Sequence, residues 1–117
     1  MIKVGIIGFG KMGQIRAKTL AESKRAEIAT IYDVNPIVNP PTKVAQSASE
    51  IINDPSIDAV FTCTPNYLIP VLCIKSLRAG KHVFSEKPPA LNAEQLVEVI
   101  KTEKASSGLK LMYGFNH

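Results

Sequence analysis

Aromatic residues, clustered basic residues and long apolar runs are scarce or missing in this sequence. Aromatics make up only 6% of the chain, too few to offer nucleic-acid bases a stacking surface, and the lysines and arginines are scattered rather than gathered into a stripe. The formal charge of +4 therefore predicts a solvated surface and no nucleic-acid interface. No apolar run approaches the length of a membrane span, and the first residues do not form a signal peptide. We therefore predict a cytoplasmic protein without a membrane partner.

The chain contains only two cysteines, Cys63 and Cys73. Their spacing is not that of metal ligands, and no partner histidine lies close to either in the sequence, so no metal site is expected. Two reduced, buried thiols in a reducing compartment are the better interpretation.

Strand-like and helix-like segments alternate along almost the whole chain. A length of 117 residues suits one domain with a real core and is too short for two, so residues 1–117 are interpreted as a single domain. The alternation predicts a doubly wound α/β fold with a mostly parallel, six-stranded Rossmann sheet. The expected strands cover Ile2–Ile7, Ala26–Tyr32, Val44–Gln46, Asp58–Thr64, His82–Ser85 and Lys110–Phe115, and the expected helices cover Met12–Ser23, Ala48–Asn53, Ile69–Ala79 and a segment that begins at Asn92. Gly80 is expected to end the third of these helices as its C-terminal cap.

The segment after the second expected strand is rich in proline, with Pro36, Pro40 and Pro41 between Val34 and Thr42. Prolines at this spacing prevent a regular helix, because each lacks a backbone N–H and has a fixed φ angle. Dinucleotide-binding folds typically have a crossover helix in this place. We expect the crossover after the second strand to be shortened to a turn.

The glycine-rich segment Gly8-Phe9-Gly10-Lys11-Met12-Gly13 joins the first strand to the first helix, and Asp33 follows at the end of the second strand. The first glycine allows a tight turn, the second lets the backbone approach a pyrophosphate, and the third lets the helix pack close to the sheet. The start of the helix adds free N–H groups and a positive dipole end. Asp33 can accept hydrogen bonds from both hydroxyls of an adenosine ribose. The sequence therefore predicts a bound dinucleotide.

A second informative segment extends from Ala79 to Pro88 and brings Glu86 and Lys87 to the carboxyl edge of the sheet, where ligands of open α/β sheets bind. A lysine at this edge can hydrogen-bond a substrate hydroxyl, or transfer a proton if burial lowers its pKa. On the spacing alone, a surface Glu–Lys pair before a rigid proline turn is an equally good interpretation.

Together these segments resemble the N-terminal half of the Gfo/Idh/MocA oxidoreductases, which include glucose–fructose oxidoreductase and inositol 2-dehydrogenase. The similarity covers essentially the whole chain. The resemblance implies an enzyme that transfers hydride between NAD(P) and a hydroxyl-bearing carbon of a sugar, sugar derivative or cyclitol. It rests on the glycine-rich segment, on Asp58-Ala59-Val60 leading to Thr64-Pro65-Asn66, on the run from Ala79 to Pro88, and on Gly114-Phe115-Asn116.

The resemblance also implies where the motif residues lie relative to the cofactor. The glycine-rich segment would hold the pyrophosphate, Asp33 the adenosine ribose, and the turn Thr64-Pro65-Asn66 would lie beside the cofactor. Glu86 would lie near the nicotinamide ribose, and Lys87, the expected catalytic residue, beside the substrate carbon. Asp33 favours NAD over NADP, because its carboxylate repels a 2′-phosphate and no arginine follows it closely.

The chain departs from the family pattern at several points. Ile69 stands where the family commonly has a histidine, three residues after the Asn of the TPN turn, and His82 is expected to pack rather than to catalyse. The family's second α/β domain, which supplies the substrate pocket and a further acid–base pair, is expected to be absent. We therefore expect the isolated chain to bind NAD without turnover, and to act on a sugar-type substrate only with that missing domain.

The sequence leaves another class of function open. A stand-alone, non-catalytic module that binds NAD or interacts with another chain is the alternative interpretation. A binder of S-adenosylmethionine fits less well, because the third glycine and the Glu86-Lys87-Pro88 segment both favour a nicotinamide dinucleotide. Without a covering domain, apolar surface at the sheet edge would favour self-association into a homo-oligomer.

Overall fold

A computed structural model describes residues 2–23, 26–64, 68–86 and 111–114 of the chain. Six strands form one sheet in the order β3-β2-β1-β4-β5-β6, and every neighbouring pair is parallel. The predicted doubly wound Rossmann sheet is confirmed, and its strand order reverses the direction of winding between β1 and β4. The elements are β1 (Ile2–Ile7), α1 (Lys11–Ser23), β2 (Ala26–Tyr32), β3 (Lys43–Val44), α2 (Ala48–Ile52), β4 (Ala59–Thr62), α3 (Ile69–Arg78), β5 (His82–Glu86) and β6 (Leu111–Gly114).

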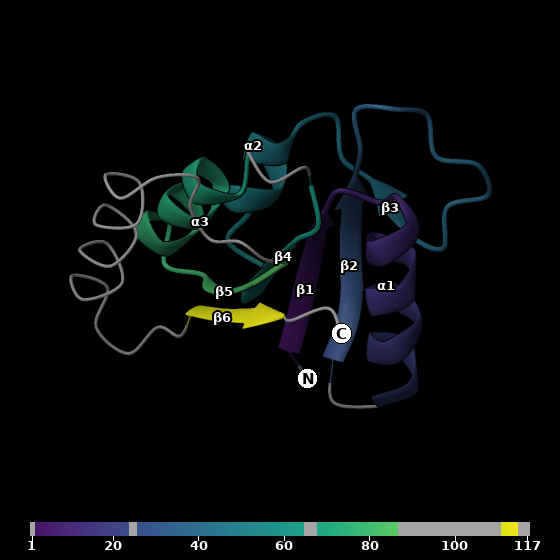
Figure 1. The fold of residues 1–117 in the computed structure, drawn as a ribbon, viewed down its shortest axis with the longest axis horizontal. Coiled ribbons are helices and arrows are strands. Elements are labelled where there is room, and N and C mark those ends of the chain that lie inside the picture. Colours follow the sequence, from purple (N-terminus) through teal and green to yellow (C-terminus); the bar gives the residue numbers. More distant parts are fainter. Residues whose placement is uncertain (1, 24–25, 65–67, 87–110, 115–117) are drawn as a thin grey trace.

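The central strand β1 contributes buried side chains to both faces of the sheet. Val4 and Ile6 belong to the same core cluster as Ala17 of α1. Ile7 belongs to a second cluster with Ile51 of α2. Helix α1 therefore covers one face, whereas α2 and α3 lie on the other (Figure 1). Burial on both sides explains why this strand is apolar without polar alternation.

β4 and β5 continue this two-sided arrangement. Val60 and Val83 are paired in register, and Val83 packs in one core cluster with side chains of α3. The next residues along the two strands, Phe61 and Phe84, are also paired and point to the opposite face. Their rings stack with centroids 4.8 Å apart, and Cζ of Arg16 on α1 lies 5.0 Å from the centroid of the Phe84 ring.

Helix α3 ends at the glycine that the sequence marks as its stop. Gly80 has a φ of 82°, in the left-handed region that glycine adopts without strain. Its N–H donates to the carbonyl of Leu77, and the N–H of Lys81 donates to the carbonyl of Ser76, both over 3.0 Å. This pair of hydrogen bonds is a Schellman motif, so the predicted C-terminal cap is confirmed.

The crossover after β2 is shortened as predicted. Residues 33–42 contain no helix, and the chain returns directly to β3, which pairs with β2 through Thr30 with Lys43 and Ile31 with Val44. The three prolines account for this, since a helix through them would lack N–H donors and clash with preceding carbonyls. The face of the sheet beside α1 is therefore covered here by a loop instead of a second helix.

Some expected boundaries differ from those observed. The third strand ends at Val44 rather than Gln46, because the Gln46 N–H donates to Oε2 of Glu50 and the Glu50 N–H donates to Oγ of Ser47. Ser47 thus caps the N-terminus of α2, and Glu50 holds the residue that precedes the cap, so the helix begins shortly after the strand ends. The side chain of His82 is exposed at the start of β5 rather than buried in the core. The helix expected from Asn92 lies outside the described residues.

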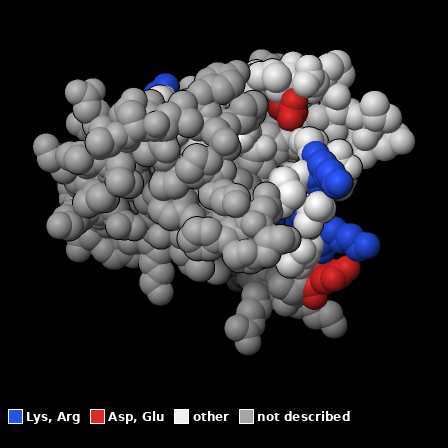
Figure 2. Space-filling view, in the orientation of Figure 1, with Lys and Arg blue, Asp and Glu red and all other residues white. Residues whose placement is uncertain are grey.

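The described residues were searched for a membrane-spanning helix and for a cluster of metal ligands. No helix within the described ranges is long and apolar enough to cross a membrane. The described residues also contain no group of three or more His, Cys, Asp and Glu side chains arranged to hold a metal ion. On the face in Figure 2, the visible basic side chains are interspersed with acidic ones.

Candidate functional site

The carboxyl ends of β1, β2 and β4 meet at the point where the strand order reverses. Gly8 follows β1, Asp33 follows β2, and Thr64 lies two residues after β4. The backbone connects these ends directly, because the Gly8 N–H donates to the carbonyl of Tyr32 and the Cys63 N–H donates to the carbonyl of Ile7, each over 2.7 Å. In open α/β sheets, ligands bind in the crevice at such a reversal.

Each glycine of the turn after β1 has a different steric reason to be glycine. Gly8 has a φ of 96°, and a Cβ there would lie 2.6 Å from the backbone carbonyl of Cys63. A Cβ on Gly13 would collide with the carbonyl oxygen of Gly8. Only glycine at position 13 therefore lets α1 pack this close to the turn. A Cβ on Gly10 would meet nothing within 4 Å. Gly10 therefore leaves open space in front of the backbone, as a closely approaching ligand requires.

The carboxylate of Asp33 holds two segments of backbone together. Its Oδ2 accepts a hydrogen bond of 2.7 Å from the Phe9 N–H in the glycine-rich turn. Its Oδ1 accepts one of 2.8 Å from the Asn35 N–H in the loop after β2. A carboxylate offers about four acceptor positions, so each oxygen keeps a lone pair for a further donor. Asp33 is thus positioned by the protein and still able to bind hydroxyl groups.

A cavity of about 360 Å³ opens between these strand ends. Asp33 is the only charged residue among its described lining residues. Oγ1 of Thr64, at its wall, is buried and has no hydrogen-bond partner among the described residues. A buried, unpaired hydroxyl in a cavity is a group that a polar ligand can satisfy. The lining consists of Ile7, Gly8, Gly10, Tyr32, Asp33, Val34, Asn35, Ala48, Cys63, Thr64, Leu68 and Leu72.

The composition of this lining suits a nucleotide. The apolar walls can hold a flat base, Asp33 can accept ribose hydroxyls, and the open backbone at Gly10 can receive a phosphate. Helix α1 begins directly after Gly10, and its first turn contains no acidic residue that would oppose an anion at the positive end of the helix. The residues present therefore fit the base, ribose and phosphate of one half of a dinucleotide.

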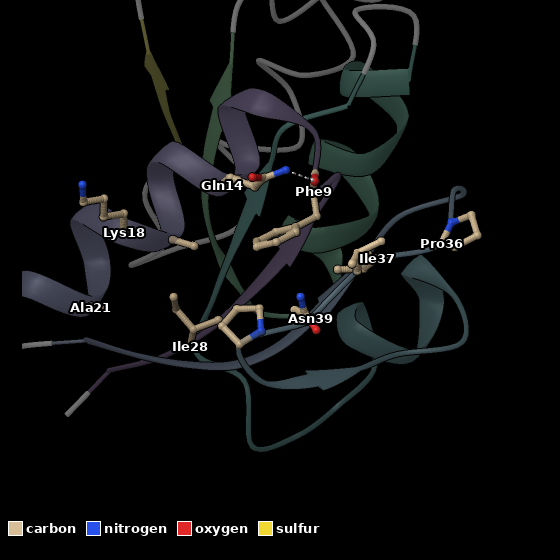
Figure 3. Close-up of a pocket in the computed structure, with 11 residues that line it drawn as sticks. Phe9, Gln14, Lys18, Ala21, Ile28, Pro36, Ile37 and Asn39 are labelled. Carbon is tan, nitrogen blue, oxygen red and sulfur yellow. Dashed lines mark hydrogen bonds between the residues drawn. The ribbon is translucent and has the colours of Figure 1, made fainter.

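A larger cavity of about 610 Å³ lies between α1, β2 and the loop that replaces the crossover helix. The Phe9 ring lies within it, near Ile28 and Ile37 (Figure 3). Phe9 is its only lining residue from the turn between Gly8 and Gly10, and Asp33 and Thr64 do not line it. The smaller cavity, which unites the glycine turn with Asp33, is therefore the better candidate site.

The structure brings only part of the predicted residue set together. Gly8, Gly10, Asp33 and Thr64 share the smaller cavity. Gly13 lets the helix pack against the Gly8 carbonyl and so supports the turn without lining the cavity. The backbone N–H of Phe9 donates to Asp33, while its ring lines the larger cavity. Neither cavity is lined by the remaining two residues of the glycine-rich segment, Lys11 and Met12.

The other predicted residues lie at or beyond the limit of the described chain. Glu86 is the last residue of β5 and pairs in register with Gly114 of β6. The positions of Pro65, Asn66 and Lys87 fall outside the described residues.

Sequence reasoning missed most of the apolar lining. Leu68 is the N-cap residue of α3, Leu72 lies in its first turns and Ala48 begins α2. Their approach to the cavity therefore depends on how both helices pack on the sheet. The spacing of Leu68 and Leu72, four residues apart on a helix, was the available signal. Asn35 had a signal too, since Asp followed two residues later by a free N–H is typical of an Asx turn.

Lys81 is another residue whose importance the sequence did not reveal. Its side chain is only 6% exposed, and its ammonium group donates to the carbonyls of Asp54 and Ile57 over 2.6 and 2.7 Å. These bonds connect the loop between α2 and β4 to the residue that precedes β5. Lys81 therefore supports the strand that leads into the candidate site, and does not line the site itself.

The buried thiol of Cys73 lies on the α3 face of the sheet. Burial raises the pKa of this thiol, and the hydroxyls of Ser85 and Thr62 beside it offset part of the rise. The neutral thiol is the form that a buried apolar position favours. Neither cysteine forms a disulfide among the described residues, and Cys73 is buried as predicted, whereas Cys63 is partly exposed.

A comparison with protein families gives one match that spans nearly the whole chain. A model described as "Oxidoreductase family, NAD-binding Rossmann fold" matches residues 2–115. The chain therefore contains an NAD(P)-binding Rossmann domain.

Two curated relatives illustrate the range of similar proteins. Myo-inositol 2-dehydrogenase of Thermotoga maritima is 30% identical over 125 residues, which cover 98% of this chain and 36% of the relative. A 2,7-anhydro-N-acetylneuraminate hydratase of Escherichia coli is 32% identical over 118 residues, which cover 97% of this chain and 32% of the relative. The chain thus spans about a third of the length of the curated relatives it matches.

Solved structures agree with the fold. A putative myo-inositol dehydrogenase from Sinorhizobium meliloti superimposes with a TM-score of 0.90 at 29% identity, covering 97% of this chain and 36% of that one. A biliverdin reductase from Synechocystis sp., in complex with biliverdin and NADP+, gives a TM-score of 0.88 at 29% identity and covers 96% of this chain and 37% of that one.

Proposed function

This chain belongs to the GFO_IDH_MocA oxidoreductase family, and from that membership we propose that the cavity between Gly8, Asp33 and Thr64 binds a nicotinamide dinucleotide. The proposal rests on one observation: a single cavity contains an open glycine turn, a positioned carboxylate and a hydroxyl that has no partner among the described residues. The comparisons support a nicotinamide dinucleotide as the ligand, and the lining residues support this cavity as its binding site.

Each residue would hold a different part of the ligand. The backbone from Gly8 to Gly13 and the start of α1 would bind the pyrophosphate, since the helix begins there and Gly10 leaves the approach open. Asp33 would accept the hydroxyls of the adenosine ribose with its remaining lone pairs. The apolar side chains of the cavity would enclose the adenine, and the Thr64 hydroxyl would gain a partner.

We further propose that NAD is preferred to NADP. A 2′-phosphate on the adenosine ribose would lie against the Asp33 carboxylate, and like charges at contact distance repel strongly. No lysine or arginine is found among the described lining residues to offset that repulsion.

The proposed reaction is hydride transfer between the cofactor and a hydroxyl-bearing carbon of a sugar, sugar derivative or cyclitol. Inositol dehydrogenases among the relatives support this substrate class. A bound nicotinamide would supply the hydride acceptor or donor. Glu86 would approach its ribose, and Lys87, the residue that follows Glu86 in the Glu-Lys-Pro segment, would exchange the proton of the substrate hydroxyl. The turn of Thr64, Pro65 and Asn66 would lie beside the cofactor.

The 117-residue chain is proposed to bind the cofactor without measurable turnover of its own. Hydride transfer requires that the substrate be held in line and that water be excluded, and the cavity between the strand ends is only large enough for part of a dinucleotide. The test is to measure NADH binding and the reduction of NAD with myo-inositol on the same sample. Binding with no reduction supports the proposal. Reduction of NAD by the chain alone would refute the proposed absence of turnover.

A further inference from the structure

We infer that the side chains of Phe9 and Ile37 are positioning groups, which hold the Asp33 carboxylate and the glycine-rich turn in place and so set the affinity for a dinucleotide. Neither side chain lines the candidate site. This inference rests on the proposed binding of a nicotinamide dinucleotide. It goes further, because it assigns a part in binding to the loop that replaces the crossover helix.

The first observation is that the Asp33 carboxylate joins two segments of backbone. Its Oδ2 accepts from the Phe9 N–H over 2.7 Å, and its Oδ1 accepts from the Asn35 N–H over 2.8 Å. The orientation of the carboxylate therefore depends on where these two N–H groups are held. Each of them lies on, or two residues before, an apolar side chain that packs into the protein, namely Phe9 itself and Ile37.

The second observation is the packing of the Phe9 ring. The ring packs against the core cluster that includes Val4 and Ala17, on the α1 face of the sheet. It also lies over the start of α1, since a Cβ on Gly13 would be 3.6 Å from Cδ1 of the ring. Because the ring and the N–H belong to one residue, close packing of the ring restricts the direction of the N–H.

The third observation is that Ile37 alone attaches the loop after Asp33 to the core. From residue 34 to residue 41, every side chain except that of Ile37 is exposed. Ile37 packs against the same core cluster as Phe9. Within the part of the chain that the structure describes, the bond from the Asn35 N–H to Asp33 is the single hydrogen bond of this segment. The position of the Asn35 N–H therefore depends on the packing of Ile37.

The fourth observation is that the larger cavity leaves these two side chains with few neighbours. Phe9 and Ile37 both line this cavity, which lies between α1, β2 and the loop (Figure 3). A crossover helix packed here would add contacts of its own, whereas the loop adds one half-buried side chain. Loss of either Phe9 or Ile37 should therefore let the two hydrogen bonds of Asp33 open more often. A ligand would then have to order these groups on binding, at a cost in affinity.

The experiment combines calorimetric titrations with NADH and hydrogen exchange of the backbone amides, followed by nuclear magnetic resonance. Ile37→Ala removes one positioning group, and Val38→Ala, at the neighbouring position that is 83% exposed, is the matched control. Phe9→Ala removes the other group, whereas Phe9→Leu keeps an apolar side chain there. Leu77→Ala, at a buried position of α3 that lines neither cavity, controls for a general loss of stability. The thermal midpoint of each variant confirms that it is folded.

We expect Ile37→Ala and Phe9→Ala each to weaken NADH binding by about tenfold, and Phe9→Leu to recover most of that loss. Val38→Ala and Leu77→Ala should bind NADH within about twofold of the natural sequence. Without any ligand, the amide of residue 9 should exchange at least about fivefold faster in Ile37→Ala than in Val38→Ala, because its hydrogen bond to Asp33 opens more often.

The inference is overturned if Ile37→Ala binds NADH as tightly as Val38→Ala, or if Leu77→Ala weakens binding as much as Ile37→Ala. It is also overturned if the amide of residue 9 exchanges at the same rate in the two loop variants. Phe9→Ala and Phe9→Leu give the same comparison if Ile37→Ala does not fold, and equal affinities for NADH in that pair would overturn the inference as well. Absence of NADH binding by the folded natural sequence would refute the proposed function itself, and the exchange rates would still decide whether Ile37 holds the Asp33 carboxylate.

Discussion

The backbone N–H of Phe9 donates a hydrogen bond of 2.7 Å to Oδ2 of Asp33, which ties the glycine-rich turn to the end of β2. The sequence presents Asp33 as a ribose ligand. The structure gives the same carboxylate a second task, since it fixes the backbone of the turn before any ligand arrives. Substitution of Asp33 should therefore affect both the stability of the protein and its affinity for a dinucleotide.

Replacing Asp33 by alanine removes two charge-assisted hydrogen bonds, to Phe9 and to Asn35. We expect a loss of about 1–3 kcal/mol in the free energy of unfolding, measured by urea denaturation. NADH binding should weaken more than NADPH binding, because only NADH is proposed to use the carboxylate. Equal losses for the two cofactors would count against the assignment of Asp33 to the ribose.

Alanine substitutions at Gly10 and Gly13 should separate binding from folding. A Cβ at position 10 meets nothing within 4 Å, so Gly10→Ala should unfold at nearly the same temperature as the natural protein. It should nevertheless lose NADH affinity by about tenfold or more, because the methyl group stands where the pyrophosphate would approach.

Gly13→Ala is the matched comparison, since its Cβ would collide with the Gly8 carbonyl oxygen. This variant should lower the thermal midpoint as well as the affinity. If Gly10→Ala bound NADH as tightly as the natural protein, the pyrophosphate could not lie against this turn.

The buried ammonium of Lys81 should stabilise the fold without taking part in binding. Lys81→Met keeps much of the side-chain volume but leaves the carbonyls of Asp54 and Ile57 without their donor. We expect a loss of about 2–3 kcal/mol in unfolding free energy. Lys75→Met, at an exposed position of α3, is the control and should change stability by less than about 0.5 kcal/mol. Similar values for both variants would show that the buried hydrogen bonds contribute little.

The raised pKa of Cys73 predicts a dependence of stability on alkaline pH. An unfolded thiol titrates near 9.0 and the folded one at a higher pH, so the unfolded state loses its proton first. The contribution of Cys73 is fully present below the unfolded pKa and is lost as the pH rises through the folded pKa. The difference in unfolding free energy between the natural protein and Cys73→Ala should therefore narrow as the pH rises above about 9. A constant difference would mean that burial does not perturb this thiol.

Local sequence signals were sufficient for much of the fold. Three prolines after Asp33 predicted the loss of the crossover helix, and Gly80 predicted the end of α3, because both effects depend on the backbone of the residue itself. The glycine-rich segment and Asp33 predicted one cavity at the sheet edge, since parallel strands end on the same side.

Contacts between distant segments could not be predicted in this way. Lys81 reaches carbonyls 24 and 27 residues earlier in the chain, and no local pattern distinguishes it from an exposed lysine. The ring of Phe9 turns away from the candidate site into the larger cavity, where it meets Ile37. Both arrangements arise only when helices and loops pack on the assembled sheet.

The central claim is that the cavity between Gly8, Asp33 and Thr64 binds a nicotinamide dinucleotide. A calorimetric titration of the purified, folded protein with NADH, repeated with the Gly10→Ala variant, tests it most directly. The account predicts saturable binding to the natural sequence and a strong loss of affinity in the variant at an unchanged thermal midpoint. No heat of binding from the folded natural protein, or equal binding by the two proteins, would contradict it.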